Sequence, residues 1–156
     1  MPEKSPWTLP GHVGRGMTVA GPRGELGWAV LAVVAAGGMA GALARFGVQS
    51  VWPSAPGGFA WATFVINVSG CLLIGALMVA ITEVWVVHRL VRPFLGVGFL
   101  GGYTTFSAYV ADIRRMVAHG VPVTALAYLG GTMVAAVAAT WCGMALARLA
   151  ARAAAR

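Results

Sequence analysis

Charged residues are scarce in this chain, and acidic residues are the scarcest of them. Of its 156 residues, 10% are charged, 59% are hydrophobic, and aspartate and glutamate together number four. Soluble domains devote about a quarter of their residues to charge. The composition therefore excludes an ordinary soluble domain and favours a protein that sits in a membrane.

Histidine and cysteine are also few, with three and two in the chain. No histidine has a neighbour at the spacing of a transition-metal site. Cys71 and Cys142 fall inside apolar stretches, which is typical of buried free thiols and not of a disulfide framework. The sequence has no phosphate-binding loop and no nucleophile–base set, so we do not expect an enzyme.

Long apolar runs fill most of the chain instead. A helix needs roughly 20 mostly apolar residues to cross a bilayer, and four segments meet this length: Leu26–Val51, Ala60–Thr82, Val91–Val117 and Val121–Ala147. We therefore predict an all-α membrane protein whose four transmembrane helices occupy residues 26–148. Residues 1–25 are predicted to be a disordered tail and residues 149–156 a basic tail. Either Met1 or Met17 can be the start.

Basic residues lie at the ends of these segments. The net charge is +7, but no basic stripe alternates with aromatic residues, so nucleic acid is not an expected partner. Under the positive-inside rule, basic residues flank the cytoplasmic ends of membrane helices. One face carries seven arginines and the other two, or three with Arg45, which places both termini in the cytoplasm if the orientation in the cell membrane is fixed. The seven are Arg15, Arg23, Arg89, Arg92, Arg148, Arg152 and Arg156, and the two are Arg114 and Arg115.

The third apolar segment contains the run G-F-L-G-G-Y-T-T-F-S-A-Y, from Gly98 to Tyr109. Paired glycines and threonines favour unwinding, and a bilayer tolerates unwound chain only where it is buried in protein or lines a watery site. We therefore predict that the third helix is broken near its middle, over Gly101–Thr105. Carbonyls freed by such a break suit a small hard cation, so the break points to a protein that handles an ion.

Polar side chains in the first two segments each have two interpretations. Arg45 either extends to the membrane surface or marks an ion path. Thr63 and Asn67 share one helix face, and the Asn67 amide either forms an interhelical hydrogen bond or offers its N–H donors to an anion. Gly37 and Gly41, four residues apart, are typical of close helix packing.

The third and fourth segments contain a second polar and aromatic set. Phe106 and Tyr109 lie three residues apart on one helix face, where they either pack or turn the positive edges of their rings toward an anion. Tyr128 and Thr132 lie one turn apart. Thr132 either faces the same path or, like Thr140, bonds a carbonyl of its own helix.

These motifs resemble those of the Fluc (CrcB) family of fluoride channels. The resemblance covers all four segments and is carried by G-G-x-x-G-A-x-x-R-F at Gly37–Phe46, A-T-F-x-x-N-V-x-G-x-x-x-I-G at Ala62–Gly75 and G-F-L-G-G-Y-T-T-F-S at Gly98–Ser107. It implies an antiparallel dimer of the dual-topology type, with two fluoride pathways and a structural sodium ion at the dimer centre. Main-chain carbonyls of Gly101 and Thr104 match the sodium ligands of the family.

The resemblance also implies the residues of a fluoride pathway. Tyr109 stands where a second phenylalanine is usual, so it adds a hydroxyl to the ring. Ala136 stands where a further hydroxyl is common, so it removes a donor. The predicted pathway residues are Asn67, Phe106, Tyr109, Tyr128, Thr132, Thr63, Ser107 and Arg45.

The function that the resemblance implies is passive export of fluoride from the cytoplasm, which relieves fluoride toxicity; fluoride and membrane lipid are the expected partners. Two alternatives stay open: a pore-silent assembly partner of a conducting paralogue, and a small proton-coupled multidrug exporter. An exporter needs a titratable carboxylate deep in the membrane, whereas we expect Glu83 near a segment end and Asp112 at the water interface. Both a homodimer and a heterodimer with a paralogue stay open. Because a subunit that inserts both ways should show almost no basic bias, the seven-to-two count favours an oppositely oriented paralogue.

Overall fold

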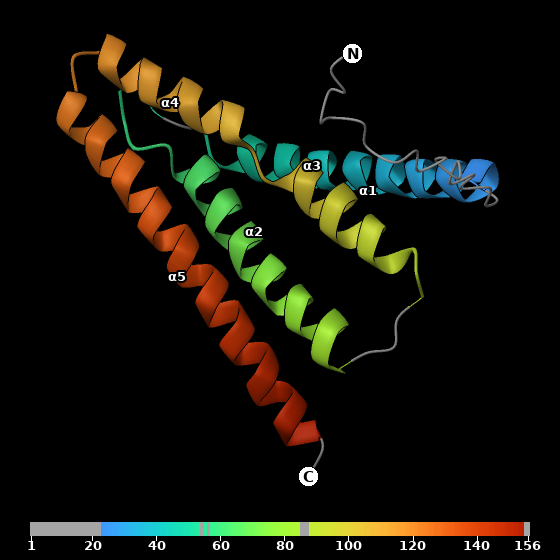
Figure 1. Ribbon diagram of the computed structural model, residues 1–156. Helices are drawn as coiled ribbons and strands as arrows, with labels where there is room; N and C mark the ends of the chain where they lie inside the picture. The colour runs from blue at the N-terminus through green and yellow to red at the C-terminus, as the bar shows by residue number, and fades with distance from the viewer. Residues whose placement is uncertain (1–22, 54, 56, 85–87, 155–156) are drawn as a thin grey trace, which may run out of the picture.

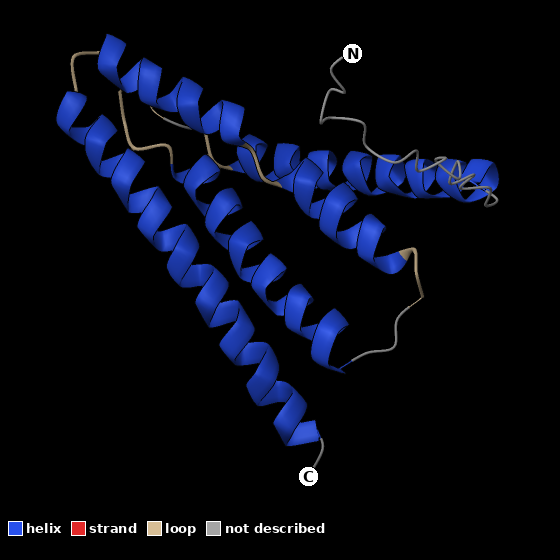
Figure 2. Cartoon of the chain, in the orientation of Figure 1, coloured by secondary structure: helices blue, strands red, loops and turns tan. Residues whose placement is uncertain are grey.

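The computed structural model describes residues 23–53, 55, 57–84 and 88–154 of the chain. Most of the predicted N-terminal tail, including Arg15 and Met17, lies outside these residues. All the regular structure in the described part is helical (Figure 2). This agrees with the predicted all-α class.

The described residues form seven consecutive helical elements (Figure 1): α1 (Arg23–Val51), α2 (Trp61–Val79), η1 (Ala80–Val84), η2 (Pro93–Leu100), α3 (Gly101–Tyr103), α4 (Phe106–Ala118) and α5 (Pro122–Ala154). The elements η1 and η2 have the wider turns of a π-helix. Together the elements give four stretches long and apolar enough to cross a bilayer: Gly27–Val51, Trp61–Glu83, Pro93–Ala118 and Pro122–Ala154. The four predicted segments are thus found close to their expected positions.

The fourth stretch extends beyond its predicted end. Residues 149–154, predicted as a tail, are helical, because their four alanines, Leu149 and Arg152 are strong helix formers. At about 1.5 Å per residue, the 33 residues of α5 span about 50 Å, more than the roughly 30 Å hydrocarbon core. Near this end, Arg148 donates to both carboxylate oxygens of Glu83, with a shortest contact of 2.8 Å, and this pair links α5 to η1.

Glycines let α2 and α5 lie side by side, running in the same direction (Figure 1). A Cβ on Gly75 would collide with the carbonyl oxygen of Thr140, and a Cβ on Gly143 with that of Leu72. Any larger residue would push the two backbones apart. Helices α2 and α5 are therefore closely packed, and the third stretch packs against both of them.

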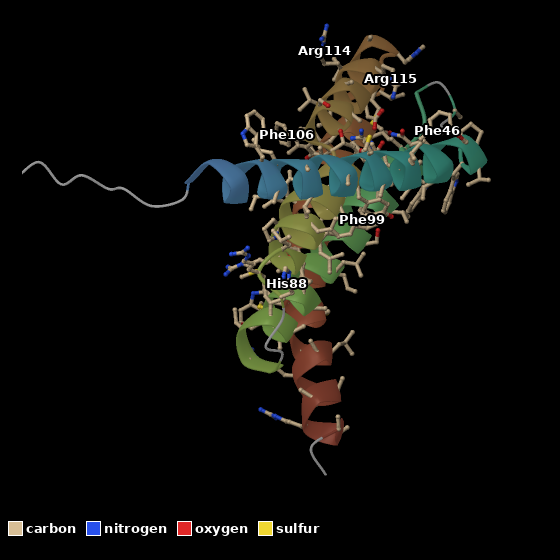
Figure 3. All side chains as sticks on the ribbon, turned by 90° about the vertical axis from the view of Figure 1, so that its right-hand side faces the viewer. Phe46, His88, Phe99, Phe106, Arg114 and Arg115 are labelled. Atoms are coloured by element: carbon tan, nitrogen blue, oxygen red, sulfur yellow. The ribbon has the colours of Figure 1, made fainter. Side chains whose placement is uncertain are left out.

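Helix α1 runs across the rest of the bundle (Figure 3) and contacts η2 through glycines. A Cβ on Gly41 would fall on the Phe99 carbonyl, and one on Gly37 on the Phe94 carbonyl. The Gly37 and Gly41 pair thus serves close packing, as its spacing predicts.

A small aromatic core closes one end of the bundle, where α4 and α5 meet. Tyr128 is fully buried there, with ring centroids of Phe59 and Tyr109 at 5.0 and 5.2 Å from its own. Met116 and Ala125 complete the core. This end carries Arg114 and Arg115, whereas His88 lies toward the opposite end (Figure 3). Arg15 and Arg156, two of the seven arginines counted for the other face, lie outside the described residues.

Candidate functional site

The third stretch leaves the helical conformation at Thr104 and Thr105. Their backbone angles are extended, with φ −75° and ψ 158° at Thr104 and φ −150° and ψ 122° at Thr105. A short loop therefore joins α3 to α4 (Figure 2). The break is shorter than the predicted Gly101–Thr105: Gly101–Tyr103 stay helical, and the extended residues are Thr104 and Thr105.

Asn67 on α2 supplies partners for the backbone at this point. Its Oδ1 accepts the Thr105 main-chain N–H at 2.9 Å, and its Nδ2 donates to the Thr105 carbonyl at 3.0 Å. The Asn67 amide therefore forms the interhelical hydrogen bond that was one of its two interpretations. Because a primary amide carries two N–H groups, one donor is left over.

Two threonine hydroxyls complete the turn. Thr105 Oγ1 accepts the Ala108 N–H at 3.1 Å and so caps the start of α4, as expected of a threonine N-cap. Thr104 Oγ1 donates to the Leu100 carbonyl at 2.8 Å. The predicted pathway residue Ser107 lies 3.3 Å from Thr105 Oγ1 and thus belongs to the cap.

Two carbonyls near the turn are only weakly engaged. In an unbroken helix the Gly101 carbonyl would accept the Thr105 N–H, but that N–H bonds Asn67 instead. The Thr104 carbonyl receives a long contact of 3.5 Å from Arg45 Nη1. Arg45 is half-buried and reaches toward the turn from α1, and its role in an ion path stays a prediction.

A groove of about 430 Å³ opens beside this turn, between α2, η2, α4 and α5. Most of its wall is apolar or small. The predicted site residues that line it are Asn67, Gly101, Thr104, Phe106, Tyr109 and Thr132, together with Cys71 and Ala136. The structure therefore brings together, on one surface, residues from three of the four predicted segments.

Two aromatic rings stand at this groove in different environments. Phe106 is 78% exposed in the single chain, whereas Tyr109 is 7% exposed, with ring centroids 5.9 Å apart and planes tilted by 45°. The Tyr109 hydroxyl donates to the main-chain oxygen of Leu129 in α5 at 2.7 Å. Its proton is thus directed toward α5, and Tyr109 is among the residues that line the groove.

Tyr128 and Thr63, two further residues of the predicted pathway, are not among the residues that line the groove, and their role stays a prediction. Tyr128 is fully buried in the aromatic core, and its hydroxyl donates to Asp112 Oδ2 at 3.3 Å. Thr63 is buried on α2, near the same end of the bundle. Phe59 and Phe64 pack against the core that contains Tyr128, so Tyr128 belongs to the packing beside the groove.

Asp112 is the residue that sequence reasoning placed wrongly. It was expected at the water interface, but it is 2% exposed. Its carboxylate pairs with Arg115 on the same helix and accepts the Tyr128 hydroxyl. The i, i+3 spacing of Asp112 and Arg115 is the signal that could have indicated the pair.

Thr132 carries a hydroxyl that the fold leaves unused. The residue is 5% exposed, and its Oγ1 has no partner within the described part of the chain. Thr140, by contrast, donates to the Ala136 carbonyl of its own helix at 3.0 Å. Of the two interpretations of these threonines, the own-helix bond therefore holds for Thr140 and not for Thr132.

Known proteins match this chain over most of its length. The family model described as "CrcB-like protein, Camphor Resistance (CrcB)" matches residues 32–144. A "Fluoride-specific ion channel FluC 2" of Nocardia farcinica is 52% identical over 128 residues, which cover 82% of this chain and 91% of the relative.

Two relatives from one streptomycete are also similar to this chain. FluC 2 of Streptomyces avermitilis is 57% identical over 67% of this chain and 66% of its own length. FluC 3 of the same organism is 42% identical over 82% of this chain and 63% of its own length. One organism therefore holds more than one protein of this kind.

Proposed function

Since the chain belongs to the CrcB-like family, we propose that it forms a fluoride-specific channel. The observation that carries this proposal is the 52% identity to a protein named as such a channel, over 91% of that protein's length. The groove beside the Thr104–Thr105 turn supports it, because it combines few polar groups with two aromatic rings. The relatives are named as ion channels, which favours this function over an enzyme or a drug exporter.

The groove offers fluoride a small set of donors. They are the second N–H of Asn67, the free hydroxyl of Thr132 and the positively polarised ring edges of Phe106 and Tyr109. An anion leaves water only where such donors replace its hydration shell. Selectivity then follows from a path whose width and donor positions suit fluoride better than the larger chloride.

Export needs no coupled energy source in this account. Hydrogen fluoride enters an acid-exposed cell as a neutral molecule and ionises at cytoplasmic pH. A negative-inside membrane potential then drives the anion outward by about 2.3 kcal/mol per charge per 100 mV.

The sodium ion is a second part of the proposal. The residues that would hold it are Gly101 and Thr104, through main-chain oxygens that the helix leaves weakly engaged. Neutral carbonyl oxygens fit a small hard monovalent cation, and the ion would supply charge to fix the turn. The Arg45 contact to the Thr104 carbonyl, at 3.5 Å, would be weakened when the cation binds, since two positive charges near one oxygen repel each other.

We further propose an antiparallel dimer, because a single chain leaves much of the groove uncovered. Phe106 is 78% exposed, and Met39, Leu43 and Phe46 on α1 are each more than 60% exposed. A second subunit would cover these side chains. The seven-to-two arginine count favours a paralogue of opposite orientation as that subunit, and organisms with several such proteins exist among the relatives. The alternative is a heterodimer in which this chain serves assembly alone and the fluoride pathway of the paralogue conducts.

Fluoride resistance of a bacterial host that lacks its own exporter tests the function. We expect growth at fluoride concentrations that stop the empty-vector strain, from this chain alone or together with its paralogue. Rescue by the pair, lost when Phe106→Ile is introduced into this chain, would place a conducting pathway here. Full rescue by the paralogue alone, unaffected by this chain, would contradict the proposal.

Orientation is tested separately by labelling single cysteines placed in the loop at Arg89 and in the turn at Gly120. A fixed chain labels each position from one side of the membrane only. Equal labelling of both positions from both sides would rule out the heterodimer argument, because it would show dual insertion.

A further inference from the structure

An unpartnered hydroxyl lies next to an interhelical hydrogen bond in the groove. Thr132 is 5% exposed, and its Oγ1 has no partner among the residues that the structure describes. Tyr109, on the facing helix α4, donates to the main-chain oxygen of Leu129 at 2.7 Å. Because Leu129 lies three residues before Thr132, both observations concern the same turn of α5.

Hydroxyls inside helices usually bond back to a carbonyl three or four residues earlier. Thr132 departs from this pattern, although the carbonyls of Leu129 and Tyr128 stand at those two positions. The helical hydroxyls that follow the pattern here are those of Ser50, Ser69, Thr82 and Thr140.

The Leu129 carbonyl, three residues before Thr132, is one of these two acceptors, and it is already in use. A carbonyl oxygen has two lone pairs, and in a helix one of them serves the N–H four residues later. The Tyr109 hydroxyl takes the second lone pair. One of the two in-helix acceptors within reach of Thr132 is therefore occupied by another residue.

The other hydroxyls that line the groove all have partners. Thr104 donates to Leu100, and Tyr109 donates to Leu129. Thr105 Oγ1 accepts from Ala108 and is within hydrogen-bond distance, 3.3 Å, of the Ser107 hydroxyl. One turn beyond Thr132, the groove is lined by Ala136, which has no hydroxyl. Among the described groove residues, the Thr132 proton is thus the hydroxyl donor left for a ligand.

We propose that the Tyr109 hydroxyl is a positioning group that keeps the Thr132 hydroxyl free to donate to an anion in the groove. This inference rests on the proposed fluoride function and adds to it a role for a hydroxyl that phenylalanine lacks. A buried O–H without an acceptor is unfavourable, and a small anion that accepts strong hydrogen bonds supplies the missing partner. Removing the Tyr109 hydroxyl frees the Leu129 carbonyl, which then competes with the anion for the Thr132 proton.

A double-mutant cycle tests the inference in proteoliposomes, with fluoride efflux measured by an electrode for this chain alone or paired with its paralogue. Tyr109→Phe and Thr132→Val should each slow efflux by about twofold to tenfold, the range of one neutral hydrogen bond. The double variant should be no slower than either single one, because both changes remove the same donor.

Two control variants separate this role from loss of an interhelical contact. Thr140→Val removes a hydroxyl that bonds Ala136 in its own helix, so its effect should multiply with that of Tyr109→Phe. Tyr103→Phe removes another interhelical tyrosine contact, the one to Ser69 at 3.0 Å, and its effect should multiply with that of Thr132→Val.

Two outcomes would overturn the inference, and they differ in what else they overturn. If the wild-type protein conducts but the Tyr109→Phe and Thr132→Val effects multiply, or Tyr109→Phe conducts like wild type, the positioning role fails and the channel function stands. If wild-type vesicles retain fluoride with and without the paralogue, the channel function and the positioning role fail together.

Discussion

The Asn67 side chain bonds both main-chain polar groups of Thr105, accepting its N–H at 2.9 Å and donating to its carbonyl at 3.0 Å. A backbone that leaves the helix inside an apolar bundle needs such partners, because lipid supplies none. One residue of α2 therefore stabilises the turn in the third stretch. The same residue keeps a second N–H for the groove, so stability and anion binding depend on one side chain.

Asn67→Asp is predicted to abolish fluoride efflux and also to destabilise the protein. A carboxylate has no N–H for the Thr105 carbonyl, and the unpaired carbonyl costs about 1–3 kcal/mol. Thermal unfolding of the purified protein and electrode efflux measure the two effects. Ser69→Ala is the matched control, because it also removes an interhelical hydrogen bond of α2, the one between the Ser69 and Tyr103 hydroxyls. An Asn67→Asp protein with wild-type thermal stability would contradict the stabilising role.

Phe106→Ile is predicted to abolish efflux with little change in the stability of the subunit. The ring is 78% exposed, so few contacts within the chain are lost, whereas the aromatic edge at the groove disappears. Size-exclusion chromatography and efflux, measured on the same preparation, separate assembly from conduction. Trp141→Ile, at an aromatic residue 72% exposed on α5 and outside the groove lining, should conduct normally. Normal conduction by Phe106→Ile would remove this ring from the pathway.

Thiol reagents are predicted to inhibit efflux through Cys71. Cys71 lines the groove one turn after Asn67, whereas Cys142 is exposed and is not among the groove residues. A small charged methanethiosulfonate should therefore slow efflux of the wild type and of Cys142→Ala, because the added group occupies the groove. The efflux rate of Cys71→Ala should be the same before and after treatment with the reagent. Inhibition that persists in Cys71→Ala would mean that the reagent acts elsewhere.

Gly75→Ala is predicted to lower the stability of the folded chain by about 1–3 kcal/mol, the usual cost of overpacking. The new Cβ would meet the Thr140 carbonyl, which is backbone and cannot rotate away. Gly131→Ala on α5 is the matched control, because nothing lies within 4 Å of a Cβ there. Melting temperatures of the two purified variants give the comparison. Equal stability of both would show that α2 and α5 can separate without loss.

The four membrane-crossing stretches could be predicted from the sequence because their signal is local. Each is a continuous apolar run, and the length needed to cross a bilayer is fixed by geometry. The end of α5 was missed since Arg148 and Arg152 resemble a tail, although alanine and arginine favour a helix in any environment.

The groove could be predicted only in part, because its contacts join residues far apart in the chain. The Asn67 pair with Thr105 spans 38 residues, and the Tyr109 contact with Leu129 spans 20. Polar residue types inside apolar runs indicated Asn67 and Thr132 correctly as groove residues. The burial of Asp112 was not predicted, because the sequence could not show that its carboxylate accepts the Tyr128 hydroxyl.

Fluoride and chloride efflux from the same proteoliposomes is the most direct measurement of the central claim that the Asn67, Phe106, Tyr109 and Thr132 groove conducts fluoride. The chain, alone or with its paralogue, should release fluoride rapidly under a potassium gradient with valinomycin and retain chloride, and Phe106→Ile in this chain should stop the fluoride signal. Release of both anions at similar rates, or fluoride release that survives loss of the Phe106 ring, would contradict the account.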